Sequence, residues 1–249
     1  MSVEKTGRLT REGVELAWAL LPGRGPTIVF LPGFKSDMAG SKATHLRDWA
    51  ATQGRAMLRL DYSGHGASGG AFEDGTIGSW TADAAAIIAA QTQGPLLLVG
   101  SSMGGWIALL LARAMPTRVA ALVGIAAAPD FTETLLWNGL NEAERATLLS
   151  DGTIERPSIY DEKPYRFTRA LIEDGRHQAL LNSPIPITCP VRLLQGQRDD
   201  DVPWPTALRI AEQLASDNVQ ITLIKDGDHR LSRPQDLALL TRTVAALLG

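Results

Sequence analysis

The sequence is poor in cysteine and in long apolar stretches. Its single cysteine, Cys189, cannot form an internal disulfide, and no C-x-x-C or Cys/His pattern of a metal site occurs in the 249 residues. No stretch approaches 18 uninterrupted apolar residues, so we expect no membrane span. The 24 basic and 27 acidic residues nearly balance, which argues against the basic surface of a nucleic-acid-binding protein. We therefore expect no nucleic acid, metal or cofactor among the partners.

The composition that remains is that of a folded globular chain. Hydrophobic residues make up 45% and charged residues 20%, which is too apolar for a disordered protein. The length fits one domain over residues 1–249. The first residues, Met1 to Arg8, lack the apolar region of a signal peptide, and from this we expect a cytoplasmic location.

Short apolar runs alternate along the chain with helical segments. Between Val14 and Leu20 apolar residues occupy every second position, which predicts a strand paired antiparallel with 8–10 through Glu12-Gly13. The continuous apolar runs that follow suit a parallel sheet covered on both faces. They are 27–31, 56–60, 96–99, 121–125, 191–194 and 219–224, and the helical segments are 42–52, 77–93, 103–115, 205–216 and 234–248. The alternation predicts an α/β fold with a mostly parallel, doubly wound sheet and an antiparallel N-terminal edge.

One interval breaks this alternation. Between Asp130 and Pro186 we find no convincing buried strand, and the connection is too long for an ordinary loop. Helices are expected at 141–150, where Asn141 is a candidate cap, and at 163–173. We interpret residues 131–186 as a helical cap inserted in the single domain. The aromatic residues of this segment are candidates to line a pocket, Trp137, Tyr160 and Tyr165 among them.

The strongest chemical signal follows the apolar run at 96–99. Gly100, Ser102 and Gly104 form a G-x-S-x-G motif between a predicted strand and a predicted helix. A sharp strand-to-helix turn lifts one serine above the sheet, and glycines flank it because side chains there would collide. The motif predicts Ser102 as a nucleophile; Ser101 is out of register with the two glycines.

A serine nucleophile needs a base, and four histidines are available. In a fold of this type the acid and the histidine follow the serine in the chain, which excludes His45 and His65. His177 lies in the predicted cap. His229 lies in the loop after the last apolar run, at the edge of the sheet where open α/β folds bind ligands, and we expect it to be the base.

The acid should follow a strand and precede His229. The form G-x-x-D-x-x-V-P, beginning at Gly196, points to Asp199, with Asp200 and Asp201 as alternatives. Asp130, after the preceding strand, is a second possible position for the acid. The acid would hold the imidazole in one tautomer and stabilise the imidazolium.

The oxyanion hole should combine the N–H of Met103, which follows the serine, with an N–H from an early loop at a strand end. Phe34, after Pro32-Gly33, is the candidate in that loop. Lys35 beside it is either a solvated charge or an anion contact. The glycine-rich segment 61–68 lacks the spacing of a phosphate-binding motif and is interpreted as a structural loop.

These motifs resemble, in order, those of the α/β-hydrolase superfamily, over nearly the whole chain. The segments that carry the resemblance are 31–34, 61–68, 100–106, 196–204 and 227–230. The chain looks most similar to the branch of palmitoyl-protein thioesterases and mycophenolic acid acyl-glucuronide esterases, through 40–43, 183–190, 200–204 and 228–230. It departs from that branch at 34–37, and its first residues lead us to expect no mitochondrial transit segment. The resemblance implies Ser102, Asp199 and His229 as a catalytic triad.

The sequence thus predicts a serine hydrolase acting on thioesters or carboxylic esters of a small molecule or an acylated protein. Thioesters are implied by the resemblance alone, because triad chemistry accepts esters equally. Two alternatives stay open: a carbon–carbon bond hydrolase with the same triad, and a small-molecule receptor that binds on this scaffold without turnover.

Overall fold

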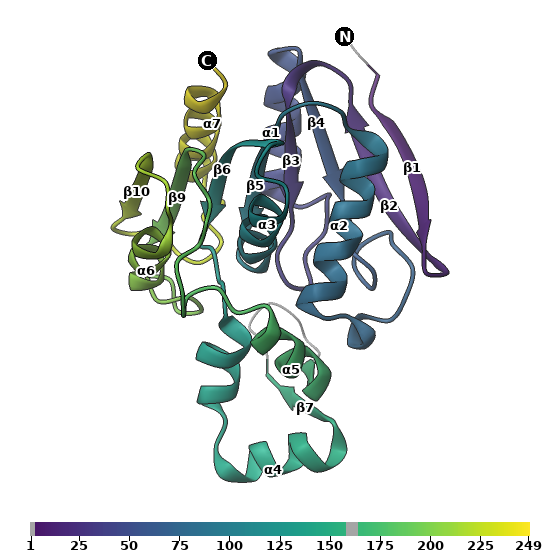
Figure 1. Ribbon diagram of the computed structural model, residues 1–249, viewed down its shortest axis with the longest axis vertical. Helices are drawn as coiled ribbons and strands as arrows, with labels where there is room; N and C mark the ends of the chain where they lie inside the picture. The colour runs from purple at the N-terminus through teal and green to yellow at the C-terminus, as the bar shows by residue number, and fades with distance from the viewer. Residues whose placement is uncertain (1–2, 158–163) are drawn as a thin grey trace.

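The computed structural model describes residues 3–157 and 164–249. At its centre is an eight-stranded sheet in the order β1-β2-β4-β3-β5-β6-β9-β10 (Figure 1). The strands are β1 (Lys5–Arg11), β2 (Val14–Leu21), β3 (Arg24–Leu31), β4 (Arg55–Leu60), β5 (Leu96–Ser101), β6 (Val119–Ile125), β9 (Val191–Gly196) and β10 (Val219–Ile224). Strand β2 pairs antiparallel with β1 and β4, and the remaining pairs are parallel. The predicted mostly parallel sheet with an antiparallel N-terminal edge is confirmed.

Successive strand residues point to opposite faces of the sheet. Because these residues are apolar on both faces, helices cover both. In β3, Ile28 packs in the same cluster as residues of α1 and α7, whereas Val29 packs with residues of α2 and α3. Leu97 and Leu98 of β5 divide in the same way. The covering helices are α1 (Ser41–Thr52), α2 (Ile77–Gln91), α3 (Met103–Ala114), α6 (Pro205–Gln213) and α7 (Pro234–Leu248), with a 3-10 turn η1 (Phe72–Asp74) before α2.

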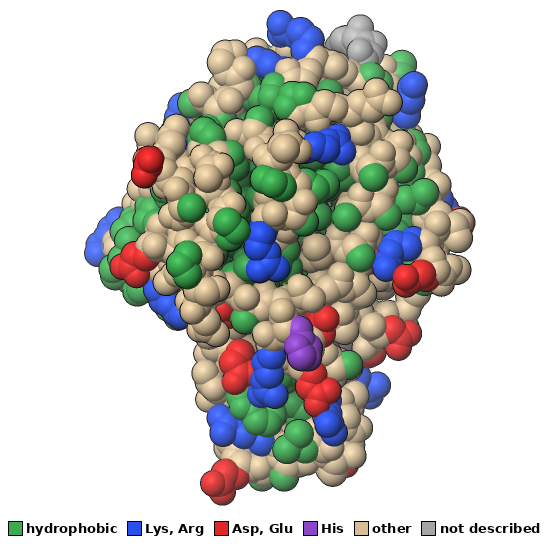
Figure 2. Space-filling view, viewed as in Figure 1, with side chains coloured by type: hydrophobic (Ala, Val, Ile, Leu, Met, Phe, Trp, Pro, Cys, Tyr) green, Lys and Arg blue, Asp and Glu red, His purple; other side chains and the backbone are tan. Residues whose placement is uncertain are grey.

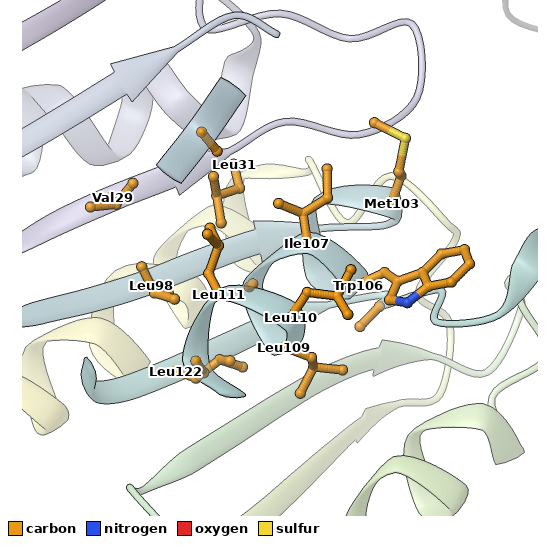
Figure 3. Close-up of a cluster of buried hydrophobic side chains, with 14 of the residues drawn as sticks. Val29, Leu31, Leu98, Met103, Trp106, Ile107, Leu109, Leu110, Leu111 and Leu122 are labelled. Carbon is orange, nitrogen blue, oxygen red and sulfur yellow. The ribbon is translucent and has the colours of Figure 1, made fainter. Parts of the chain in front are cut away.

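Helix α3 is buried over most of its length. Its residues from Met103 to Ala112 are all buried, as expected for a helix that is apolar on every side. Figure 3 shows leucines of this helix beside strand residues that include Leu98 and Leu122, whereas the ring of Trp106 is directed away from them. Because α3 begins at the residue after Ser102, this packing fixes the position of that serine.

Between β6 and β9 the chain leaves the sheet. The elements of this segment are η2 (Thr132–Leu136), η3 (Trp137–Gly139), α4 (Glu142–Asp151), β7 (Thr153–Arg156), β8 (Tyr165–Thr168) and α5 (Arg169–His177). They lie beyond one end of the sheet, away from both chain termini (Figure 1). The segment has a small core of its own, formed by Leu136, Leu140, Leu148, Ile154 and Ile172. That residues 131–186 act as a cap stays a prediction.

Within this segment the sequence-based reading is right about one helix and wrong about the next. Asn141 caps α4 as expected, because its side chain accepts the N–H of Glu144 at 2.9 Å. The helix expected at 163–173 begins only at Arg169, and the residues before it form β8, which pairs antiparallel with β7. Each strand has four residues, too few to produce a recognisable apolar run. Lys163 and Tyr160 lie outside the described residues.

The surface carries both signs of charge. On the face shown in Figure 2, Lys and Arg side chains are interspersed with Asp and Glu side chains. Within residues 3–157 and 164–249, no helix has the length and hydropathy needed to cross a membrane.

Candidate active site

The turn from β5 into α3 presents Ser102 in a strained backbone conformation, with a φ of 53°. The flanking glycines are required by the close approach of other backbone. A Cβ on Gly100 would lie 2.1 Å from the carbonyl oxygen of Gly104, and one on Gly104 would lie 2.1 Å from that of Leu31. No side chain fits at these distances, which explains the G-x-S-x-G spacing. The turn leaves the hydroxyl of Ser102 facing the pocket described below.

His229 lies between Ser102 and Asp199. Its Nε2 is 3.1 Å from Oγ of Ser102, and its Nδ1 is 2.9 Å from Oδ2 of Asp199. The three residues follow the carboxyl ends of β5, β9 and β10. These strands run parallel, so their carboxyl ends lie along the same edge of the sheet. The Asp199 side chain is fully buried and that of His229 is 17% exposed. The structure therefore brings together the three residues that the sequence indicated.

The carboxylate of Asp199 has further partners on both oxygens. Oδ1 accepts the N–H groups of Asp201 and Val202 at 3.0 and 2.8 Å, and Oδ2 accepts the amide N–H of Gln195 at 2.9 Å. Sequence reasoning missed Gln195. The signal that could have revealed it is a polar residue directly after the apolar run Val191–Leu194, where its side chain is buried at the strand end.

The alternative acids have other positions. Asp200 and Asp201 are exposed and line the mouth of the pocket. Asp130 is buried and accepts the N–H groups of Leu180 and Leu181 at 2.8 and 2.9 Å. Its burial raises the pKa of the carboxyl group, against the effect of these two hydrogen bonds. Asp130 thus connects the start of the segment that follows β6 to Leu180 and Leu181 near its end. Among the described contacts, Asp130 makes no hydrogen bond to His229.

The other histidines are bound elsewhere. His45 on α1 is half-buried and lies 3.0 Å from Oγ1 of Thr241 on α7, rather than in solvent. His65 is buried among aromatic rings, including those of Tyr62 and Trp80, and burial lowers the pKa of its imidazole. His177 is exposed in the last turn of α5.

The candidate oxyanion donors flank the serine. Met103 opens α3, and the N–H groups of a first helical turn have no acceptor inside the helix. A Cβ on Gly33 would lie 3.3 Å from Cβ of Ser102, so the loop of Phe34 passes directly beside Ser102. The ring of Phe34 stacks on Phe167 of β8, with centroids 5.4 Å apart. That both amides serve as an oxyanion hole stays a prediction.

Lys35 follows with a left-handed backbone, at φ 53°. Its ammonium group lies over the rings of Phe72 and Tyr165, at 5.0 and 4.7 Å from their centroids. The sequence did not indicate this cation–π arrangement. Lys35 also lines the cavity described next, and the two roles expected from the sequence, a solvated charge or an anion contact, stay predictions.

A cavity of about 840 Å³ opens at Ser102 and His229. The segment after β6 contributes a largely apolar wall, formed by Phe131, Leu135, Leu136, Tyr165 and Phe167, together with the charged side chain of Arg156. Tyr165 therefore lines the pocket as expected, whereas the ring of Trp137 lies under the guanidinium groups of Arg145 and Arg176.

A metal would find few free ligands here. Within the described residues, the one group of possible ligand atoms lies on Asp199, Asp201 and His229, within 4.8 Å of one another. Two of these side chains are already hydrogen-bonded to each other. Cys189 is half-buried, and burial raises the pKa of its thiol.

Residues 28–238 match the model of the alpha/beta hydrolase family. The chain belongs to this family. It is a hydrolase with the fold that the resemblance implied. It is 41% identical over 234 residues to the bovine protein named palmitoyl-protein thioesterase ABHD10, mitochondrial, and 40% identical to the human one, covering 94% of this chain and 76% of each relative.

Two solved structures are similar over their full length. A putative hydrolase from Agrobacterium vitis S4 superposes with a TM-score of 0.96 at 43% identity, covering 99% of this chain and 100% of that one. Mouse alpha/beta hydrolase domain-containing protein 10 gives a TM-score of 0.91 at 39% identity, with 98% of both chains covered.

The names of the curated relatives contradict one prediction. We expected a cytoplasmic location, but the bovine, orangutan and human proteins are named mitochondrial. The prediction was wrong because it rested on the first few residues, and neither the fold nor the chemistry of the site depends on the compartment.

Proposed function

We propose that this alpha/beta hydrolase is a serine hydrolase that cleaves acyl thioesters or carboxylic esters through an acyl-enzyme intermediate. The observation that carries the proposal is the hydrogen-bonded row from Asp199 through His229 to Ser102, at 2.9 and 3.1 Å, at the floor of the cavity. A hydroxyl, an imidazole and a buried carboxylate in this order form the arrangement that activates serine for acyl transfer.

The reaction proceeds in two halves. Oγ of Ser102 attacks the carbonyl carbon while its proton passes to Nε2 of His229, and the same proton then goes to the leaving thiol or alcohol as its bond to carbon breaks. Water next gives a proton to Nε2 as it attacks the acyl-enzyme. The bond between the acyl carbon and Oγ then breaks, Nε2 returns the proton to Oγ, and the acid leaves. Asp199 stabilises the imidazolium in both halves. The N–H groups of Phe34 and Met103 donate to the oxyanion, each worth about 3 kcal/mol to the transition state.

The cavity walls support an acyl substrate. Phe131, Leu135, Leu136 and Phe167 offer an apolar surface beside the nucleophile. A thioester as the bond cleaved is supported by the bovine and human relatives, which are named palmitoyl-protein thioesterases. We propose a small molecule or a protein that carries such an acyl group as the substrate.

Replacing the nucleophile tests this function. Ser102→Ala should lower kcat on p-nitrophenyl esters and on palmitoyl thioesters by about 10³-fold or more, since the remaining groups cannot form an acyl-enzyme. Ser101→Ala is the matched control, because it removes a neighbouring hydroxyl at the end of β5. Turnover by Ser102→Ala close to that of the unmodified chain would contradict the proposal.

Two further measurements separate the alternatives. A fluorophosphonate probe should label Ser102, whereas a receptor with an inert serine would not react. A carbon–carbon bond hydrolase would cleave vinylogous diketones in preference to esters, and the same purified protein can be assayed on both.

A further inference from the structure

Lys42 is the second residue of α1, yet its side chain ends in the loop that carries His229. Its Nζ donates a hydrogen bond to the carbonyl oxygen of Arg230, the residue directly after His229. The same nitrogen lies 3.4 Å from Oγ of Ser232, which donates to that carbonyl at 3.0 Å. The backbone beside the proposed base is therefore held by a side chain from a distant part of the chain.

Lys42 lines the main cavity at Ser102 and His229. Together with Ile125, Leu194 and Ile224 it also lines a small void of about 10 Å³, beside β6, β9 and β10. Helix α1 follows the loop of Phe34, so Lys42 links the side of the pocket that holds the candidate oxyanion donor to the side that holds the base.

The loop that Lys42 holds is a strained one. Leu231 has a φ of 43°, and its N–H donates to Oδ1 of Asp228 at 2.9 Å. Such a backbone persists only when its surroundings hold it in place. Arg233 ties the far end of the loop through ion pairs with Asp226 and Asp236, both shorter than 3 Å. Lys42 acts at the near end, next to His229.

We propose that Lys42 is a positioning residue for His229: by holding the Arg230 carbonyl, its ammonium group keeps Nε2 of His229 within hydrogen-bond reach of Ser102. Lys42 touches no reacting atom and carries no proton in this proposal. The inference rests on the proposed function, in which His229 is the base.

The protonation of Lys42 should make kcat depend on pH, and this dependence tests the positioning role. Burial, and next the positive charge of Arg230, lower the pKa of Lys42 to about 8, while the carboxylates of Asp228 and Asp236 oppose this shift. The ammonium group therefore loses its charge within the range of an enzyme assay, and a charged donor makes a stronger hydrogen bond than a neutral one. An arginine at this position would stay charged.

The test compares Lys42→Met, Lys42→Arg and Lys225→Met on a short-chain carboxylic ester from about pH 6 to about pH 9.5. Lys225 is an exposed lysine at the start of the same loop and serves as the matched control. We expect Lys42→Met to lower kcat by about 10- to 100-fold with KM within about twofold, because small displacements of a catalytic group cost this much. The rate of fluorophosphonate labelling should fall by the same factor, and Lys225→Met should behave as the unmodified chain.

Lys42→Arg should recover most of the loss, and its kcat should stay level above about pH 8, where that of the unmodified chain declines as Lys42 loses its proton. Unchanged kcat in Lys42→Met would overturn the inference. Identical pH profiles of the unmodified chain and of Lys42→Arg would overturn it as well, and this comparison still decides if Lys42→Met does not fold. Turnover by Ser102→Ala would instead overturn the proposed function itself.

Discussion

At the residue scale, the orientation of His229 depends on how firmly Asp199 is held. Donors on both carboxylate oxygens fix the plane of Asp199, so that Oδ2 points at the imidazole. Gln195 contributes one of these donors, and its second contact, to the carbonyl oxygen of Val202 at 3.2 Å, fixes the amide in turn. If Asp199 is the acid of the proposed triad, Gln195 is expected to position His229 through it.

Replacing this amide tests that role. Gln195→Leu replaces the amide with an apolar side chain of similar volume and removes the donor to Asp199. We expect kcat to fall about tenfold with KM unchanged, since a hydrogen bond to a charged group is worth about 1.5 kcal/mol, and about 1.4 kcal/mol is a factor of ten in rate. Gln220→Leu, on the exposed side of β10, is the matched control. Ester hydrolysis measured at several substrate concentrations separates the two constants, and an unchanged kcat would contradict the role.

The glycine after Ser102 in the motif gives a prediction about stability. In Gly104→Ala the added Cβ would meet the carbonyl oxygen of Leu31 at 2.1 Å, so β3 or α3 must move. We expect the free energy of unfolding to fall by about 2 kcal/mol or more, as in overpacked cores. In Gly139→Ala the nearest atom is the flexible guanidinium of Arg156 at 3.7 Å, and this control should stay within about 0.5 kcal/mol. Urea unfolding compares the two; equal losses would be inconsistent with the geometry.

The sequence pointed to Ser102, Asp199 and His229, which the structure brings together, because each belongs to a local pattern whose chain order is informative. Gln195 and Lys42 belong to no such pattern. Their roles come from contacts between segments far apart in the chain, and a single sequence does not report these. The cation–π contacts of Lys35 were missed for the same reason.

At the scale of elements, the central strands were predictable because both of their faces are buried, which makes them continuous apolar runs. The short strands β7 and β8 lie at the pocket with only some of their residues buried, so their pattern resembles that of a loop or a helix. The antiparallel pairing that joins them is stabilised by tertiary contacts, such as the stacking of Phe167 on Phe34.

Asp130 connects the ends of the segment from η2 to α5, and its removal should loosen that segment. In Asp130→Asn only one oxygen remains to accept the N–H groups of Leu180 and Leu181, and the new amide group faces a donor. We expect a loss of about 1–3 kcal/mol in the free energy of unfolding, as for a buried unsatisfied donor. Backbone amides of the segment should exchange with deuterium faster, and KM should rise more than kcat falls.

Asp151→Asn is the control for this variant, because Asp151 is exposed at the end of α4 within the same segment. If hydrogen exchange in the segment is equally slow in both variants, the connection through Asp130 does not hold it in place.

At the scale of the whole molecule, the pocket is a joint product of two parts of the chain. The edge of the sheet supplies Ser102 and His229, and the segment after β6 supplies a largely apolar wall that also includes Arg156. The sequence indicated both the sheet edge and the inserted segment, but not which side chains of the segment line the pocket. It placed Trp137 at the pocket, whereas that ring packs under arginine side chains on the outside.

The apolar wall should determine which acyl chains are accepted. Leu135 lines the cavity and is half-buried, so Leu135→Trp would fill part of the space beside the nucleophile without entering the core. Excluding two or three methylene groups would cost roughly 2 kcal/mol of binding, at about 0.8 kcal/mol each. We therefore expect kcat/KM for long-chain p-nitrophenyl esters to fall about 10- to 30-fold, while that for the acetyl ester changes little. Leu149→Trp adds the same bulk at a position that is 51% exposed on α4, and should leave the chain-length profile unchanged. A uniform loss over all chain lengths would mean that Leu135 affects the reacting groups rather than the acyl site.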